Sequence, residues 1–293
     1  MSIKHTAVNT VKRQMSATDV RTQGLDKFYT RPEVVVRLLC ELNAVYPIDI
    51  FGLVVEPSAG SGSFSSRLPS GTIALDVHPE HPGVLEQNFF EFSPPNCQKA
   101  ERILVVGNPP FGKGCSLAVR FFNHAATFAD VIAFVIPRTF RRDSVQNRLC
   151  LHFHLVHDSE VASSPCAFEP AMSVKCCFQI WEKRPTTRTR THLPTSHPDF
   201  EFLKHGPKDC RGQPTPPEGA DFAIRAYGGK CGQLATEGLG ALRPKSWHWV
   251  RSRIPPAELI RRLGTLDYSG STDTARQNSL GKGDLVRLYS LRG

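Results

Sequence analysis

Continuous apolar runs separated by helix-like stretches limit the possible folds of this chain more than any other feature. Four such runs are GLVVE, GTIALD, RILVVGN and DVIAFVIP, at residues 52–56, 71–76, 102–108 and 130–137. None of them alternates with polar residues, which is typical of strands that are buried on both faces. The pattern predicts an α/β fold whose mostly parallel sheet is covered on both sides by helices.

Helices and two further strands complete the predicted region. Apolar residues recur at helical spacing over 32–42 and 117–128, and a mixed basic helix is expected over 139–152. The stretches HLVHDSEV at 154–161 and VKCCFQIWEK at 174–183 have β-type composition. Because they follow each other closely, we expect them to form an antiparallel pair at one edge of the sheet.

Composition divides the chain into four parts. Residues 1–24 show no periodicity and are predicted to form a flexible arm, whereas residues 25–185 carry the α/β pattern. Residues 186–219 are rich in proline, threonine and arginine, which predicts a linker. Residues 220–293 contain short strand-like and helix-like stretches, and we expect a small C-terminal α+β extension that supports substrate recognition.

Charge and cysteine usage restrict the possible functions. Lysine and arginine number 36 against 27 aspartates and glutamates, a formal net charge of +9. This excess favours a polyanionic partner such as nucleic acid, although a basic surface also serves solubility. The nine cysteines include no CxxC pair or Cys/His knuckle, so neither a disulfide framework nor a metal site is predicted. Without a signal peptide or a membrane span, we expect a cytoplasmic protein, or a nuclear one in a eukaryote.

A glycine-rich turn follows the first apolar run, in EPSAGSGSF. Gly60 and Gly62 let the backbone turn sharply beneath a ligand, because glycine accepts positive φ and leaves room. Asp76 ends the next run, where its carboxylate can accept hydrogen bonds from both hydroxyls of a ribose. A plain tight turn and a helix-capping aspartate are the alternatives. Together, the two features predict a ribose-containing cofactor.

The third apolar run ends in NPPF, from Asn108 to Phe111. Prolines end a strand because they donate no hydrogen bond and fix φ, but they do not explain the flanking residues. The Asn108 side-chain oxygen and the Pro109 carbonyl offer two acceptors, and Phe111 offers a ring face. These groups suit the amino group of a planar nucleobase; a strand-terminating turn is the alternative.

At these motifs the sequence resembles the S-adenosylmethionine-dependent amino-methyltransferases of nucleic acids. The stretches FYTRPEVV, EPSAGSGSF, ALDVHP and NPPF occur in the order in which this family places its cofactor motifs before the catalytic tetrad. The resemblance implies a Rossmann-like methyltransferase domain with S-adenosyl-L-methionine as cofactor. It also implies methylation of the N6 amino group of adenine, with which the NPPF variant is mostly associated.

Roles for individual residues follow from the same resemblance. The implied catalytic residues are Asn108, Pro109, Pro110 and Phe111. The implied cofactor-binding residues are Tyr29, Thr30, Glu56, Ala59, Gly60, Gly62, Asp76, Asn88 and Phe89. Asn88 stands where the family usually has aspartate, and its amide oxygen would still accept from the amino group of the cofactor's adenine. We therefore expect weaker cofactor binding.

The resemblance implies direct methyl transfer to adenine in DNA, with RNA, structured or capped, as the alternative polymer. A protein glutamine is a further alternative, against which Phe111 counts because such enzymes usually carry tyrosine there. Asn88 favours a different alternative, a non-catalytic nucleic-acid-binding module on the same fold. Because the C-terminal extension is short, we expect a short target sequence or a separate specificity partner.

Two other stretches combine basic and aromatic residues. The segment PRTFRRDSVQNR, at 137–148, either neutralises phosphates or forms a solvated helix face. Trp247 and Trp249, with Arg251 and Arg253, either contact nucleic acid or belong to an ordinary half-buried strand.

Overall fold

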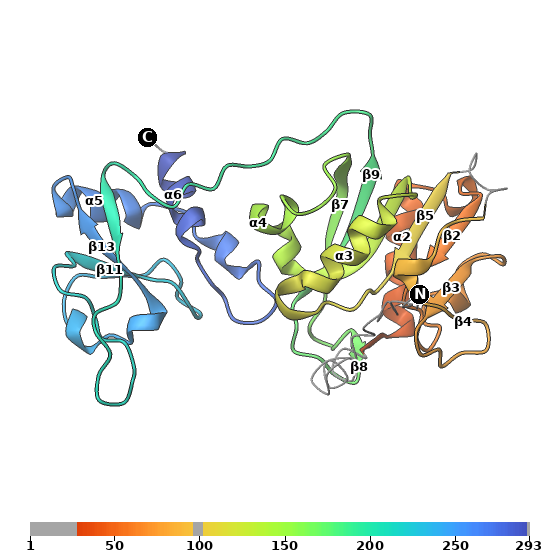
Figure 1. Cartoon of the computed structure of the whole chain (residues 1–293), viewed down its shortest axis with the longest axis horizontal. Coiled ribbons are helices and arrows are strands. Elements are labelled where there is room, and N and C mark those ends of the chain that lie inside the picture. Colours follow the sequence, from red (N-terminus) through yellow and green to blue (C-terminus); the bar gives the residue numbers. More distant parts are fainter. Residues whose placement is uncertain (1–27, 96–101, 292–293) are drawn as a thin grey trace, which may run out of the picture.

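The structure, a computed structural model, describes residues 28–95 and 102–291. A seven-stranded sheet and a four-stranded sheet lie at opposite ends of an elongated molecule (Figure 1). A third, two-stranded sheet pairs β1 (Tyr29–Thr30) with β8 (Phe168–Glu169). The predicted flexible arm, residues 1–24, lies outside the described residues.

The large sheet has the strand order β4-β3-β2-β5-β6-β9-β7. Its strands are β2 (Leu53–Glu56), β3 (Ile73–Asp76), β4 (Leu85–Glu86), β5 (Ile103–Gly107), β6 (Val131–Pro137), β7 (Phe153–Val161) and β9 (Cys176–Lys183). Neighbours from β4 to β6 are parallel, whereas β9 is antiparallel to both β6 and β7. Among these seven strands only β9 is reversed. The predicted Rossmann-like α/β fold with an antiparallel edge is confirmed.

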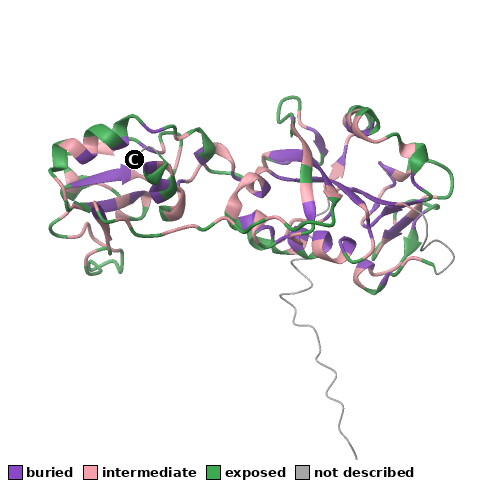
Figure 2. Cartoon of the chain, turned by 90° about the horizontal axis from the view of Figure 1, so that it is seen from above, coloured by how far each residue is buried: buried purple, intermediate pink, exposed green. Residues whose placement is uncertain are grey.

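Helices cover both faces of this sheet, as the continuous apolar runs predict. Val105 of β5 belongs to a core cluster under α3 (Ser116–Ala125), and Leu104 belongs to a second cluster under α2 (Pro32–Val45). Adjacent strand residues point to opposite faces, so both faces need apolar side chains. Figure 2 shows the buried strands between the helices.

The predicted helix over residues 139–152 is wrong in length. The chain forms a 3-10 turn (Arg138–Arg141) and then only α4 (Asp143–Gln146). Arg142, between them, has extended backbone and donates to the main-chain oxygens of Asp273, at 2.7 Å, and Ser279. Tertiary hydrogen bonds to the C-terminal part of the chain therefore override the local helical pattern.

The C-terminal unit is a four-stranded antiparallel sheet with helices on one face, which confirms the predicted α+β extension. The sheet has the order β10-β13-β11-β12. Its elements are β10 (Phe200–Leu203), β11 (Phe222–Arg225), β12 (Leu234–Ala235), β13 (Trp247–Ser252), α5 (Pro256–Gly264) and α6 (Lys282–Ser290). Phe200, Leu263 and Leu285 belong to the buried cluster of this unit.

Two sequence expectations for this unit change. The strand β10 lies inside residues 186–219, the predicted linker, because Phe200 is buried and its segment pairs with β13. Trp247 and Trp249 are only 7% and 1% exposed, so their rings are core residues rather than a stacking surface for bases. The half-buried-strand alternative describes them better.

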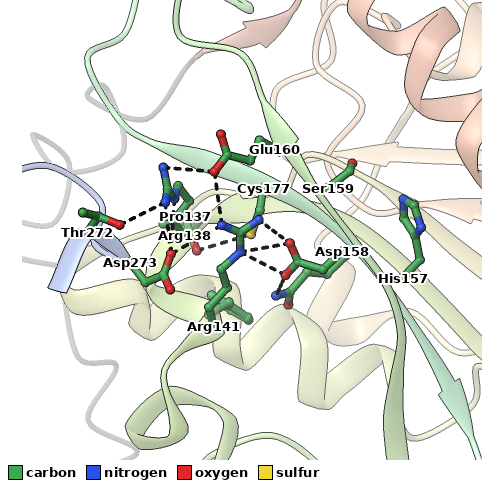
Figure 3. Close-up of polar contacts among 12 residues, drawn as sticks. Pro137, Arg138, Arg141, His157, Asp158, Ser159, Glu160, Cys177, Thr272 and Asp273 are labelled. Carbon is green, nitrogen blue, oxygen red and sulfur yellow. Dashed lines mark hydrogen bonds and ion pairs between the residues drawn. The ribbon is translucent and has the colours of Figure 1, made fainter. Parts of the chain in front are cut away.

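Arginines after β6 dock the C-terminal unit onto the large domain (Figure 3). Arg138 and Arg141 contact the Asp273 carboxylate at 3.2 and 3.4 Å, and Arg141 also pairs with Asp158. Arg142 donates to main-chain carbonyls. Three of the basic side chains considered for phosphate neutralisation are therefore already paired with other groups of the protein. Such partly buried charge pairs are geometrically specific, which suits docking.

Residues 28–95 and 102–291 contain neither a membrane-spanning helix nor a cluster of metal-binding side chains. None of the helices in this part of the chain is long and apolar enough to cross a membrane. Nor do three or more His, Cys, Asp or Glu side chains gather there in an arrangement that could hold a metal ion.

Candidate active site

The candidate site lies where the strand order reverses direction. The chain passes outward from β2 through β3 to β4 and then returns to β5 on the other side of β2. In open α/β sheets, ligands bind in the crevice at the carboxyl ends of the strands at this point. Glu56 ends β2 and Gly107 ends β5, so the glycine turn and the NPPF tetrad both leave the sheet here.

The two motif segments touch each other. Gly107 has a φ of +152°, and a Cβ atom at this position would lie 3.2 Å from Cγ of Glu56. Ser58 Oγ donates a hydrogen bond to the main-chain oxygen of Asn108 at 3.1 Å. Sequence reasoning missed Gly107 and Ser58; the glycine before Asn108 was the available signal, because glycine marks a close approach of the backbone.

The side chain of Asn108 is oriented by one hydrogen bond and free at its other end. Its Nδ2 donates to the main-chain oxygen of Phe28 at 3.0 Å, which leaves Oδ1 pointing the other way. Oδ1 is buried and has no hydrogen-bond partner. A buried acceptor without a donor costs about 1–3 kcal/mol, so an external donor would relieve this cost.

The other residues of the tetrad shape the loop around Asn108. Pro109 is buried, while Pro110 and Phe111 are half-buried. The main-chain oxygen of Phe111 accepts from the nitrogens of Leu117 and Ala118, both at 3.2 Å, and so ties the tetrad to the start of α3. The structure therefore holds the loop from both of its ends.

Asp76 fastens the glycine turn. Its Oδ2 accepts from the main-chain nitrogen of Gly60 and its Oδ1 from that of His78, both at 2.8 Å. Gly60 and Gly62 have positive φ values of 50° and 79°, and Ala59 donates its amide to Leu75 at 2.9 Å. Each oxygen of Asp76 keeps a further lone pair, so the predicted ribose contact is compatible with this fastening role.

Two side chains lie directly over the glycines. A Cβ atom on Gly60 would be 2.6 Å from the ring of Tyr29, and one on Gly62 would be 2.8 Å from the ring of His81. Burial, together with the carboxylate of Glu80, raises the pKa of Tyr29 to about 12, so this phenol is neutral at pH 7. His81 was missed from the sequence, because the eleven histidines show no spacing of functional type.

A cavity of about 320 Å³ opens between β1 and the glycine turn. Its lining includes three of the predicted cofactor residues, Tyr29, Thr30 and Gly62. The lining residues that sequence reasoning did not select are Arg31, Pro32, Ser61, Ser63, Ser66, Arg67 and Glu169. The pairing of β1 with β8 brings Glu169 to this cavity from more than a hundred residues along the chain, so no local pattern marks it.

Glu56 is a buried acid at the base of the site. It is 2% exposed, and this burial raises its pKa to about 8 because the charged form loses its hydration. The carboxyl group is therefore mostly protonated at pH 7. Its Oε2 has no hydrogen-bond partner.

Unpartnered buried polar atoms gather at this site. In the described residues there are five: Thr30 Oγ1, Arg31 Nε, Glu56 Oε2, Ser65 Oγ and Asn108 Oδ1. Three belong to residues predicted for the site, and Arg31 follows one of them directly. Because folded proteins satisfy most buried polar groups, such a concentration indicates a place prepared for a ligand.

Asn88 and Phe89 are placed differently from expectation. Asn88 Oδ1 accepts from the amide of Phe90 at 3.1 Å, and Nδ2 donates to Glu91 at 3.0 Å, so the side chain caps a 3-10 turn. Phe89 is 2% exposed and stacks on Phe121 in the core, with ring centroids 5.3 Å apart. Neither side chain lines the cavity.

Substitution of Gly62 provides a test of this packing. Gly62→Ala should lower the free energy of unfolding by about 1–3 kcal/mol more than Gly71→Ala, because the new methyl group meets the His81 ring. Gly71 is the matched control, with a φ of +95° and nothing within 4 Å of its Cβ position. Urea denaturation of both variants measures the difference. Equal losses would show that His81 does not pack on the turn.

Comparisons with known proteins add little to these observations. No protein-family model and no curated protein matches the chain. Among solved structures, a candidate RNA methyltransferase from Pyrococcus horikoshii is 18% identical with a TM-score of 0.39, covering 53% of this chain and 83% of that one. The 23S rRNA methyltransferase ErmE is 16% identical with a TM-score of 0.38, covering 54% and 71%.

A third similar structure is the methyltransferase subunit of a type I restriction-modification system from Streptococcus thermophilus. It is 15% identical with a TM-score of 0.34, covering 58% of this chain and 48% of that one. Likenesses at this level carry no argument about function. The fold class rests on the strand order and directions given above.

Proposed function

We propose that this protein transfers a methyl group from S-adenosyl-L-methionine to the N6 amino group of adenine in DNA. The observation that carries the proposal is the buried, unpartnered Oδ1 of Asn108 at the carboxyl end of β5. An acceptor in this position suits the N–H of an incoming amino group. The formal charge of +9 supports a polyanionic substrate.

The residues around the glycine turn fit the proposed cofactor. Thr30 Oγ1 and Glu56 Oε2 are buried polar atoms without partners, and the cavity between β1 and the glycine turn offers about 320 Å³. Asp76 and Asn88 each keep acceptor capacity beyond their protein partners, for the ribose and the adenine of the cofactor respectively. When bound, S-adenosyl-L-methionine supplies an electrophilic methyl group.

The tetrad would prepare the target amino group for attack. The lone pair of an exocyclic adenine nitrogen is conjugated with the ring, so this nitrogen is a poor nucleophile. Hydrogen bonds to Asn108 Oδ1 and to the Pro109 carbonyl would favour a pyramidal nitrogen and stabilise the positive charge that develops on it. The amino nitrogen would take the methyl group as its bond to the sulfonium sulfur breaks, which leaves S-adenosylhomocysteine. The extra proton on nitrogen would then pass to solvent, so no general base is needed before attack. Phe111 would stack on the extruded base.

Two alternatives remain as rival proposals. Methylation of RNA uses the same site chemistry and differs only in the polymer. A non-catalytic binding module is favoured by one observation: the Asn88 oxygen is already engaged as a cap, and so it is a weaker partner for a cofactor.

Transfer of a labelled methyl group from S-adenosyl-L-methionine to unmodified DNA and RNA tests the proposal. Nucleoside digestion and mass spectrometry should yield N6-methyldeoxyadenosine. If N6-methyladenosine were found in the RNA and no methylated nucleoside in the DNA, RNA would be the substrate. Cofactor binding without any methylated nucleoside would reject nucleic-acid methylation, and nucleic-acid binding without cofactor binding would support the binding module.

A further inference from the structure

A loop of the C-terminal unit reaches the edge of the sheet that carries the candidate active site. This docked loop, residues 272–279, leads into α6 and approaches the large domain (Figure 1). The main-chain oxygen of Ala275 accepts from the nitrogen of Lys175 at 2.7 Å, and the oxygen of Lys175 accepts from the nitrogen of Arg138 at 2.9 Å. Arg138 directly follows β6, which pairs with β5 beside the tetrad. The loop therefore lies beside the residues that follow β6, at the same carboxyl edge of the sheet from which the tetrad leaves β5.

Both arms of the docked loop are fastened to the large domain. On one arm, the Asp273 carboxylate contacts two arginines, as Figure 3 shows, and Lys175 Nζ donates to the Thr272 oxygen at 2.9 Å. On the other arm, Lys175 Nζ also donates to Asn278 Oδ1 at 2.7 Å. Further hydrogen bonds bind Arg142 to main-chain oxygens of both arms. A loop held in this way presents its tip in one fixed geometry.

The tip of the docked loop consists of Arg276 and Gln277. Both are exposed, and within residues 28–95 and 102–291 neither side chain makes a hydrogen bond or an ion pair; the Gln277 amide lies beside Gly228. This contrasts with the neighbouring arginines, which the protein binds itself. Arginine pairs in bidentate fashion with guanine and glutamine with adenine, so these two side chains suit the reading of base edges.

We infer that the docked loop reads the bases flanking the target adenine, with Arg276 and Gln277 as the specificity-determining side chains. This inference rests on the proposed function, because it takes the substrate to be DNA. The fastened arms fix the backbone that carries the two side chains, so the loop itself loses little entropy on binding. A preference for particular flanking bases would then arise within the short C-terminal unit, without a separate specificity partner.

Methylation of a DNA library with random bases on both sides of a central adenine tests this inference. Full-length wild type, Arg276→Ala and Gln277→Ala are compared by sequencing the methylated fraction. Each variant should lose about tenfold in preference at one flanking position, the loss expected for one bidentate base contact. Arg276→Lys should lose the same flanking preference, because lysine keeps the positive charge but lacks the planar, two-pronged guanidinium group.

Arg243→Ala is the matched control, because it removes an exposed positive charge elsewhere in the same unit. It should keep the wild-type flanking preference. Calorimetric affinity for S-adenosyl-L-methionine should be the same in all variants, since the loop does not line the cavity.

Three outcomes would overturn the inference. If Arg276→Ala and Gln277→Ala matched Arg243→Ala while the wild type methylated DNA, the loop inference alone would fail. An equal loss of methylation by Arg276→Ala at every flanking sequence, with the preference unchanged, would indicate a phosphate contact instead of base reading. If the wild type methylated no DNA, the proposed function would fail and the inference would fall with it.

Discussion

Replacing Asn108 with alanine should lower kcat/KM for methyl transfer by about 10²–10³-fold, the loss typical of removing one preorganised polar group from a transition state. Oδ1 of Asn108 is buried without a partner, and the Phe28 carbonyl orients the amide. Alanine keeps the backbone, so the Pro109 carbonyl stays in place. The substitution removes the hydrogen bond to the target amino group and the one to the Phe28 carbonyl.

The affinity of the Asn108→Ala variant for S-adenosyl-L-methionine should stay close to that of the wild type, because Asn108 does not line the cavity. Single-turnover transfer to an adenine-containing oligonucleotide and calorimetric cofactor titration separate the two effects. Asn43→Ala is the matched control, since Asn43 also holds a backbone group but lies at the end of α2. If the Asn108→Ala variant kept full activity, the catalytic role assigned to the tetrad would be wrong.

The wild-type protein should become less stable as the pH rises from 6 to 8, because of Glu56. Its pKa is about 8 in the folded protein and about 4.5 when unfolded. Between these values the folded state binds the additional proton, so raising the pH favours the unfolded state. The stabilisation that comes from protonated Glu56 is fully present below the pKa of the unfolded state. It is lost as the pH rises through the pKa of the folded state. The expected loss from pH 6 to pH 8 is about 2 kcal/mol.

Glu56→Gln should remove this pH dependence, because glutamine resembles the protonated acid and does not titrate. At pH 8 the variant should therefore be more stable than the wild type, as measured by urea denaturation at both pH values. Glu86→Gln, on the exposed edge strand β4, is the control and should retain the wild-type loss of stability. A wild type whose stability does not fall between pH 6 and pH 8 would contradict a buried, protonated Glu56.

Several features of the fold could be predicted because local sequence carries their cause. Strands buried on both faces must be apolar throughout, so β2, β3, β5 and β6 are visible as continuous runs. Glycines in EPSAGSGSF mark a turn that needs positive φ, and the structure gives Gly60 and Gly62 such values. The roles assigned to the NPPF tetrad and to the cofactor residues stay predictions.

Other features depend on partners that are distant in the chain. The strand β10 forms only because Phe200 and its neighbours pair with β13, about fifty residues later. His81 lies over Gly62, and Glu169 joins the cavity through β1 and β8. Phe89 follows Asn88 in a motif position, yet its ring packs into the core instead of the cavity.

The sequence by itself determined the layered α/β architecture and the two segments that meet at the carboxyl edge of the large sheet, because periodicity and glycine chemistry act over a few residues. Only the tertiary structure decided which polar groups are free to act. Arg138, Arg141 and Arg142 are equally basic in the sequence, but folding gives them protein partners, whereas Asn108 Oδ1 and Glu56 Oε2 are buried without any. Whether a polar group is satisfied depends on its neighbours in space, which residue type and spacing do not specify.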